Sequence, residues 1–237
     1  MDVLRMLDAG RRFKEAAGVC RIAGVSKPVV ARTLDDARRW AADGTALFLG
    51  AVAELSDAQM LEPSALPGWT VGQVIGHVAA NADALGNLAD WARTGVEKPM
   101  YASPEAREAT IESARTMSAV QVVSWFTASA EELNAKLDEL SADQWQVQVT
   151  TRKGQVLACE IPWMRAREVC VHAVDLGLDV DFEDLPGDFL EALVWDICGA
   201  RGLDPERLPH GPIGEVAAWL AGRPYVLPNA PELGPWL

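Results

Sequence analysis

The chain has 237 residues, 49% of them hydrophobic, which is enough for one large domain or for one domain and a small partner. Its 34 acidic and 21 basic residues give a formal net charge of -13, which argues against nucleic-acid binding because a phosphate backbone would be repelled. The sequence holds no apolar run of the length, about 18 residues, that marks a membrane span.

The N-terminal region gives weak signals. We expect residues 1–25 to form a short helix or a loosely attached extension, interrupted by Gly18 and Gly24. Charged residues break up the stretch where a signal peptide would need an apolar core, so a cytoplasmic protein is expected. The four cysteines are widely scattered without a Cys-x-x-Cys pair, which favours four reduced thiols.

Two long helices are expected next. Ser26 is typical of a helix start, and residues 29–55 carry the first long helix. Thr70 is a good N-cap for a second helix that extends to about Arg93. His77 lies at the edge of its core stripe, where it either bonds to a neighbour or serves as a ligand. The stripe has helical spacing and consists of Val71, Val74, Ile75, Val78, Ala82 and Leu85.

A third helix is expected from Arg107 to about Leu140, after a connector that is broken by glycine and proline. Two segments with alternating patterns follow at residues 146–151 and 155–159, and together they predict a small hairpin. Pro162 is then typical of the first turn of a fourth helix.

The fourth helix carries the most informative spacing. Glu168 and His172 are four residues apart, so on a helix both side chains can reach one metal ion. The chain has only three histidines, and His77 is better placed than the remaining one to supply a third ligand. A solvated polar face that includes Arg165 would have the same pattern, and spacing alone favours it. Asp175 would either orient a ligand or lie on the surface.

After the fourth helix, further helices are expected at residues 189–200 and 213–221, with a loop rich in proline and glycine between them. Bundles commonly build metal sites from facing helices, so His77 on the second helix could meet the fourth. The expected domains are an N-terminal extension (1–25), a metal-binding four-helix bundle with a hairpin before its fourth helix (26–180) and a small C-terminal subdomain (181–237).

Several segments together resemble one family. They are LPGWT at 66–70, GHVAANADAL at 76–85, WARTGVEKPMYASPEAR at 91–107, IPWMRAREVCVHAVDLG at 161–177 and AGR at 221–223. In these segments the chain resembles the mycothiol-dependent maleylpyruvate isomerases, within the DinB-like superfamily of metal-dependent thiol transferases. The resemblance implies a mainly α fold, a DinB-like four-helix bundle, with a C-terminal subdomain that is shortened in this chain.

The resemblance also implies a site. The family's metal ligands fall on His77, Glu168 and His172, the three residues that the spacing had singled out, and they would hold zinc or another divalent metal ion. Arg107 and Arg223 fall near the reaction, where arginine forks would bind the carboxylates of a substrate. The implied cofactor is mycothiol, whose thiolate would complete the metal's coordination.

The implied enzyme is a zinc- and mycothiol-dependent isomerase that converts maleylpyruvate to fumarylpyruvate by reversible thiolate addition, as in gentisate-type aromatic degradation. One alternative is a mycothiol S-transferase that attaches the thiol to another electrophilic metabolite. A further alternative is a non-catalytic binding protein on the same fold. The expected partners are therefore a small-molecule substrate and a low-molecular-weight thiol, and not a nucleic acid or a membrane.

Overall fold

The computed structural model describes residues 32–236, and the expected extension at residues 1–25 lies outside this range. The described chain forms two compact units, each with its own core. The larger unit comprises residues 37–180, and the smaller one comprises residues 181–236 together with residues 32–36.

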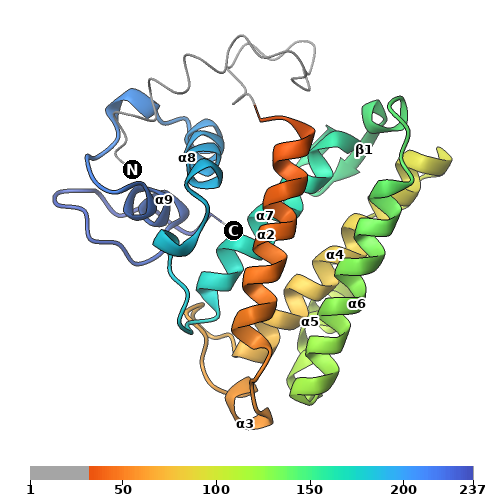
Figure 1. The fold of residues 1–237 in the computed structure, drawn as a ribbon, viewed down its shortest axis with the longest axis horizontal. Coiled ribbons are helices and arrows are strands. Elements are labelled where there is room, and N and C mark those ends of the chain that lie inside the picture. Colours follow the sequence, from red (N-terminus) through yellow and green to blue (C-terminus); the bar gives the residue numbers. More distant parts are fainter. Residues whose placement is uncertain (1–31, 237) are drawn as a thin grey trace. The chain divides into compact units, whose positions relative to one another are not determined.

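The larger unit is built on four helices that lie alongside one another (Figure 1). α4 packs against both α6 and α7. The rings of Phe48 in α2 and Phe126 in α6 stack with their centroids 4.7 Å apart. These contacts confirm the predicted four-helix bundle. The four helices are α2 (Leu34–Val52), α4 (Val71–Thr94), α6 (Ala119–Asp138) and α7 (Ile161–Asp175).

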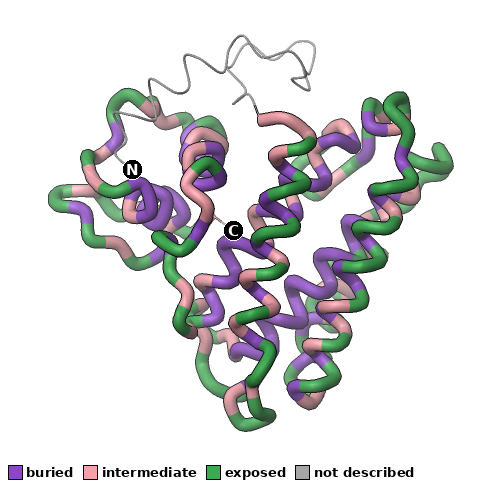
Figure 2. The backbone as a smooth tube through the Cα atoms, in the orientation of Figure 1, coloured by how far each residue is buried: buried purple, intermediate pink, exposed green. Residues whose placement is uncertain are grey.

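Helix α4 begins where the sequence predicts. Thr70 is its N-cap and forms a capping box, in which Thr70 Oγ1 accepts from Gln73 N at 3.3 Å and Gln73 Oε1 accepts from Thr70 N at 3.0 Å. The helix ends at Gly95, whose φ of 73° provides a left-handed C-cap. The predicted apolar stripe is buried, and so are most residues on the other faces of α4 (Figure 2). The helix therefore forms the centre of the bundle.

The third predicted helix is wrong in its extent. The sequence pattern predicts one helix over residues 107–140, whereas the structure has α5 (Pro104–Ser113), a 3-10 turn (Ala114–Thr116) and then α6. Met117 has extended backbone with ψ of 146°, and Ser118 starts α6 with a capping box to Gln121. The Ser-x-x-Gln signal therefore ends one helix and begins the next within a continuous apolar pattern. A short helix, α3 (Asp57–Met60), also precedes α4.

The predicted hairpin is present before α7. Strands β1 (Gln148–Thr151) and β2 (Gly154–Leu157) are antiparallel and join through a tight turn in which Gly154 has φ of 117°. Cys170 and Cys198 are free, buried thiols, but Cys159 is disulfide-bonded, so the expectation of four reduced thiols is wrong. Spacing along a chain does not show which thiols meet in the fold.

The smaller unit contains α8 (Gly187–Arg201) and α9 (Ile213–Ala221), which pack against each other. Side chains of these helices hold the segment that follows α9: Arg201 donates to the carbonyl of Gly234, and Trp219 Nε1 donates to that of Pro231 at 2.6 Å. The described residues of this unit contain no strand. Across residues 32–236, no helix is both long and apolar enough to span a bilayer.

Candidate metal centre

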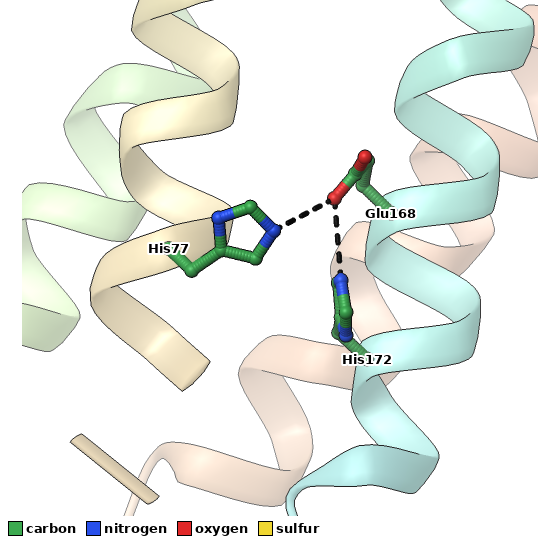
Figure 3. A group of neighbouring side chains, drawn as sticks. All are labelled: His77, Glu168 and His172. Atoms are coloured by element: carbon green, nitrogen blue, oxygen red, sulfur yellow. Dashed lines mark ion pairs between the residues drawn. The ribbon is translucent and has the colours of Figure 1, made fainter. Parts of the chain in front are cut away.

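Three of the predicted site residues meet between α4 and α7 (Figure 3). His77 comes from the second turn of α4, and Glu168 and His172 lie one turn apart on α7. Glu168 Oε2 lies 3.2 Å from His77 Nε2 and 3.3 Å from His172 Nε2. One possible ligand atom from each residue lies within 4.8 Å of the other two. The structure therefore brings together the three residues that spacing and resemblance had selected.

The polar side of α7 is covered, and not solvated. Arg165, His172 and Asp175 are only 2%, 3% and 1% exposed, and the Glu168 side chain is 17% exposed. Helix α4 packs against α7. The interpretation of these residues as a solvated face is therefore wrong, because helical spacing shows which residues share a side and does not show what covers that side.

Burial and ion pairing change the proton affinities of this cluster. Burial favours the neutral form of Glu168, but His172 and His77 outweigh it and hold the pKa of this carboxyl well below its usual range. Burial lowers the pKa of His77. Burial also opposes a charged His172, but Asp175 and Glu168 together raise its pKa to about 9. At neutral pH Glu168 is therefore ionised, so the cluster contains a buried carboxylate between two imidazoles.

The donor set fits a divalent metal ion. Glu168 Oε2 is buried and close to two ring nitrogens, yet it has no hydrogen bond among the described residues. Leaving a buried carboxylate oxygen without a hydrogen bond is costly, and a cation held by the three donors would satisfy it. Two imidazoles and one carboxylate suit zinc and other first-row metals, and three protein ligands leave a position open.

His172 is oriented by a second carboxylate. Its Nδ1 lies 2.8 Å from Asp175 Oδ2, so that Nε2 is the nitrogen left to face Glu168. Asp175 is itself fixed, because its main-chain carbonyl accepts from Ala65 N at 3.0 Å. A carboxylate behind a histidine ligand sets the ring's tautomer and direction. This geometry favours the ligand-orienting interpretation of Asp175 over the surface one.

Of the two predicted arginines, Arg107 reaches the cluster. It comes from α5, and its Nη2 lies 3.4 Å from His77 Nδ1. Tyr101 lies beside it, with its ring centroid 6.0 Å from the guanidinium carbon, and burial raises the pKa of this phenol. Arg223 belongs to the smaller unit, where it is 7% exposed and its Nη1 donates to the carbonyl of Ala221 at 2.7 Å. Its role in the reaction stays a prediction.

Two residues near the cluster escaped sequence reasoning. Nothing in the pattern of the connector before α5 marks Tyr101. Arg165 was visible only as a member of a polar face, yet its Nη1 donates to the carbonyl of Val78 at 2.6 Å and lies 3.3 Å from Asn81 Oδ1. Burial lowers the pKa of this guanidinium to about 10. Arg165 thus ties α7 to α4 one residue beyond His77, and only a prediction of which helices pack together would have revealed it.

The larger unit is a four-helix bundle with a buried cluster of two histidines and a glutamate between its helices, the arrangement of a candidate metal-binding bundle. The family model described as the mycothiol maleylpyruvate isomerase N-terminal domain matches residues 30–177. The crystal structure of a mycothiol-dependent maleylpyruvate isomerase is 31% identical to this chain, with a TM-score of 0.80 over 89% of this chain and 100% of that one. The chain therefore belongs to the mycothiol-dependent maleylpyruvate isomerase family, and it is an enzyme of that family.

Two other comparisons complete this assignment. A structure of the same isomerase with one histidine replaced by alanine matches with the same identity, coverage and TM-score. YfiT from Bacillus subtilis, described as a probable metal-dependent hydrolase with an unusual four-helix bundle topology, is 17% identical, with a TM-score of 0.52 over 68% of this chain and 91% of that one. This second likeness shows the fold alone. Comparison with curated proteins finds no match.

Proposed function

We propose that this enzyme is a zinc- and mycothiol-dependent cis-trans isomerase that converts maleylpyruvate to fumarylpyruvate in the cytoplasm. The observation that carries the proposal is the convergence of His77, Glu168 and His172, whose ligand atoms all lie within 4.8 Å of one another. The match to a mycothiol-dependent maleylpyruvate isomerase over 89% of the chain supports the choice of thiol and substrate.

In this proposal the three cluster residues hold the metal ion and Asp175 holds one of them in place. When bound, the metal ion would lower the proton affinity of the thiol and so supply a thiolate nucleophile at neutral pH. Asp175 Oδ2 accepts a hydrogen bond from the Nδ1–H group of His172 and so keeps Nε2 directed at the cluster, as the distance of 2.8 Å supports. Burial of the cluster keeps water from competing for these donors.

The proposed substrate carries carboxylates, and arginine is the side chain that binds them best. Arg107 lies at the edge of the cluster and is half-buried, so its guanidinium can contact a substrate held against the metal site. Arg223 is proposed as a second carboxylate-binding residue on the strength of the resemblance. Neutral Tyr101 beside Arg107 offers a phenol O–H donor to the same carboxylate.

The test is an assay of the zinc-loaded enzyme with maleylpyruvate and mycothiol, in which fumarylpyruvate and free thiol are both measured. Isomerisation with full recovery of the thiol supports the proposal. Stoichiometric loss of thiol would instead indicate an S-transferase, and no turnover would favour a binding protein. Glu168→Gln should abolish turnover, whereas the control Glu112→Gln, an exposed glutamate on α5, should retain it.

A further inference from the structure

Trp69 lies against His77 just before α4 begins. The centroids of the indole and imidazole rings are 5.7 Å apart, and the ring planes meet at 77°, which is an edge-to-face contact. Trp69 immediately precedes the N-cap Thr70 and is half-buried, so part of its side chain is open to solvent. A proposed metal ligand therefore has a large and partly open aromatic surface beside it.

The main chain holds Trp69 in this position. Its carbonyl accepts from Ser64 N at 2.9 Å and from Ser64 Oγ at 3.0 Å, and its N–H donates to the carbonyl of Leu66 at 3.1 Å. The same loop is tied to the end of α7, because Ala65 N donates to the carbonyl of Asp175 at 3.0 Å. The loop therefore fixes the indole relative to both helices that supply the cluster.

The cluster is more accessible at Glu168 and His77 than at His172. The side chains of Glu168 and His77 are 17% and 10% exposed, whereas that of His172 is 4% exposed. A ligand that comes from solvent to the open metal position therefore passes the first two residues. Trp69 contacts one of them, so its indole is within reach of the part of the ligand that extends away from the metal ion.

We propose that Trp69 is the stacking surface for the hydroxylated rings of the thiol cofactor. This inference rests on the proposed function. Mycothiol carries its sulfur on an N-acetylcysteine arm, and that arm is joined to glucosamine and inositol rings. With the sulfur at the metal ion, the remainder of the molecule extends toward solvent, where the indole borders His77. The face of an indole is electron-rich and attracts the polarised C–H groups of such rings.

The substrate fits this surface less well than the thiol does. Maleylpyruvate carries two carboxylates, and the negative face of an aromatic ring repels them. Cationic groups bind carboxylates instead, and Arg107 is such a group next to the cluster. The electrostatics of the indole therefore favour the uncharged rings of the thiol.

The first test is the dissociation constant of two thiols from the zinc-loaded enzyme, measured by calorimetry. Mycothiol and N-acetylcysteine share the sulfur-bearing arm, but only mycothiol has the rings. Trp69→Leu should weaken mycothiol binding about tenfold and leave N-acetylcysteine binding unchanged, because a stacked contact and its buried surface are lost. Trp69→Phe keeps a smaller aromatic face, so mycothiol binding should weaken less.

Two further measurements separate this role from a structural one. The zinc dissociation constant, obtained by competition with a chelator, should be the same in Trp69→Leu and in the wild type, since His77 keeps its place. In the isomerase assay, Trp69→Leu should raise the KM for mycothiol about tenfold and leave the KM for maleylpyruvate unchanged. The matched control is Trp91→Leu, which removes a half-buried tryptophan about 21 Å beyond His77 along α4 and should alter none of these values.

Unchanged mycothiol binding in Trp69→Leu would overturn the inference. Equal weakening of both thiols, weaker zinc binding, or a change confined to the KM for maleylpyruvate would overturn it as well, and each of these results leaves the proposed function standing. Mycothiol binding that depends on Trp69, without any isomerisation, would refute the proposed reaction and support the inference. If the zinc-loaded wild type binds neither thiol, both are refuted.

Discussion

Gly76 lets α4 pass very close to the 3-10 turn that follows α5, one residue before His77. A Cβ at Gly76 would lie 2.3 Å from the Cβ of Ala114 and 3.5 Å from Trp125 Cζ3. Carbon atoms pack at about 3.5–4.0 Å, so Gly76→Ala requires the helix and the turn to separate by roughly 1 Å or more. This close approach makes the substitution a sensitive probe of how His77 is positioned.

The expected magnitude follows from two opposing effects. Overpacking of a well-packed core costs about 1–3 kcal/mol, whereas alanine in place of glycine within a helix gains about 1 kcal/mol. We therefore expect Gly76→Ala to lower the free energy of unfolding by up to about 2 kcal/mol. Ala114→Gly removes the methyl group that the new side chain strikes. In that background Gly76→Ala should be neutral or stabilising, which gives a coupling energy of about 1–3 kcal/mol.

The assay is urea unfolding of the four members of this double-mutant cycle, followed by circular dichroism. Gly50→Ala is the matched control, since a Cβ at Gly50 in α2 would meet nothing within 4 Å, and it should be neutral or stabilising. Zinc affinity should weaken in Gly76→Ala and recover in the double variant, because His77 moves with the helix. An equal cost of Gly76→Ala with and without Ala114→Gly would refute the proposed close approach.

Three further outcomes are expected. His172→Ala should lose metal and activity together while its helical circular dichroism survives, and unchanged metal content would remove His172 from the ligand set. Arg107→Ala should lower kcat/KM for a dicarboxylate substrate at least about tenfold, because the substitution removes a hydrogen bond between charged groups. An unaltered kcat/KM would exclude Arg107 from the site. In metal-free protein the pKa of His172 is raised from 6.5 to about 9, so its contribution to stability is complete below pH 6.5 and is lost as the pH rises through 9. Urea unfolding across this range should show that decline, and Asp175→Asn should flatten it; an identical pH profile in the variant would contradict the assigned cause.

Local signals predicted most of the fold. Thr70 with Gln73 located the start of α4, and helix α9 was expected over the residues where it lies. The break between α5 and α6 was missed because apolar spacing continues across it, although Ser118 and Gln121 formed a recognisable capping box. Strong local capping overrode a continuous pattern there.

The candidate site was predicted in part because two of its proposed ligands obey simple helical spacing. Glu168 and His172 are four residues apart, so their place one helical turn apart can be inferred from the sequence without a structure. Their burial, and the contact of Arg107 with His77, depend on how helices pack, which spacing along one helix cannot show. The resemblance supplied the pairing of helices that the residues alone left open. Tyr101 had neither spacing nor resemblance to single it out.

The metal centre is the central claim, and metal content tests it most directly. Elemental analysis of the purified protein, before and after addition of zinc, should be made beside the triple variant in which His77, Glu168 and His172 are changed to alanine. We expect about one zinc ion per wild-type chain and none in the variant. Absence of zinc from the wild type after its addition, or equal zinc in both proteins, would contradict the account.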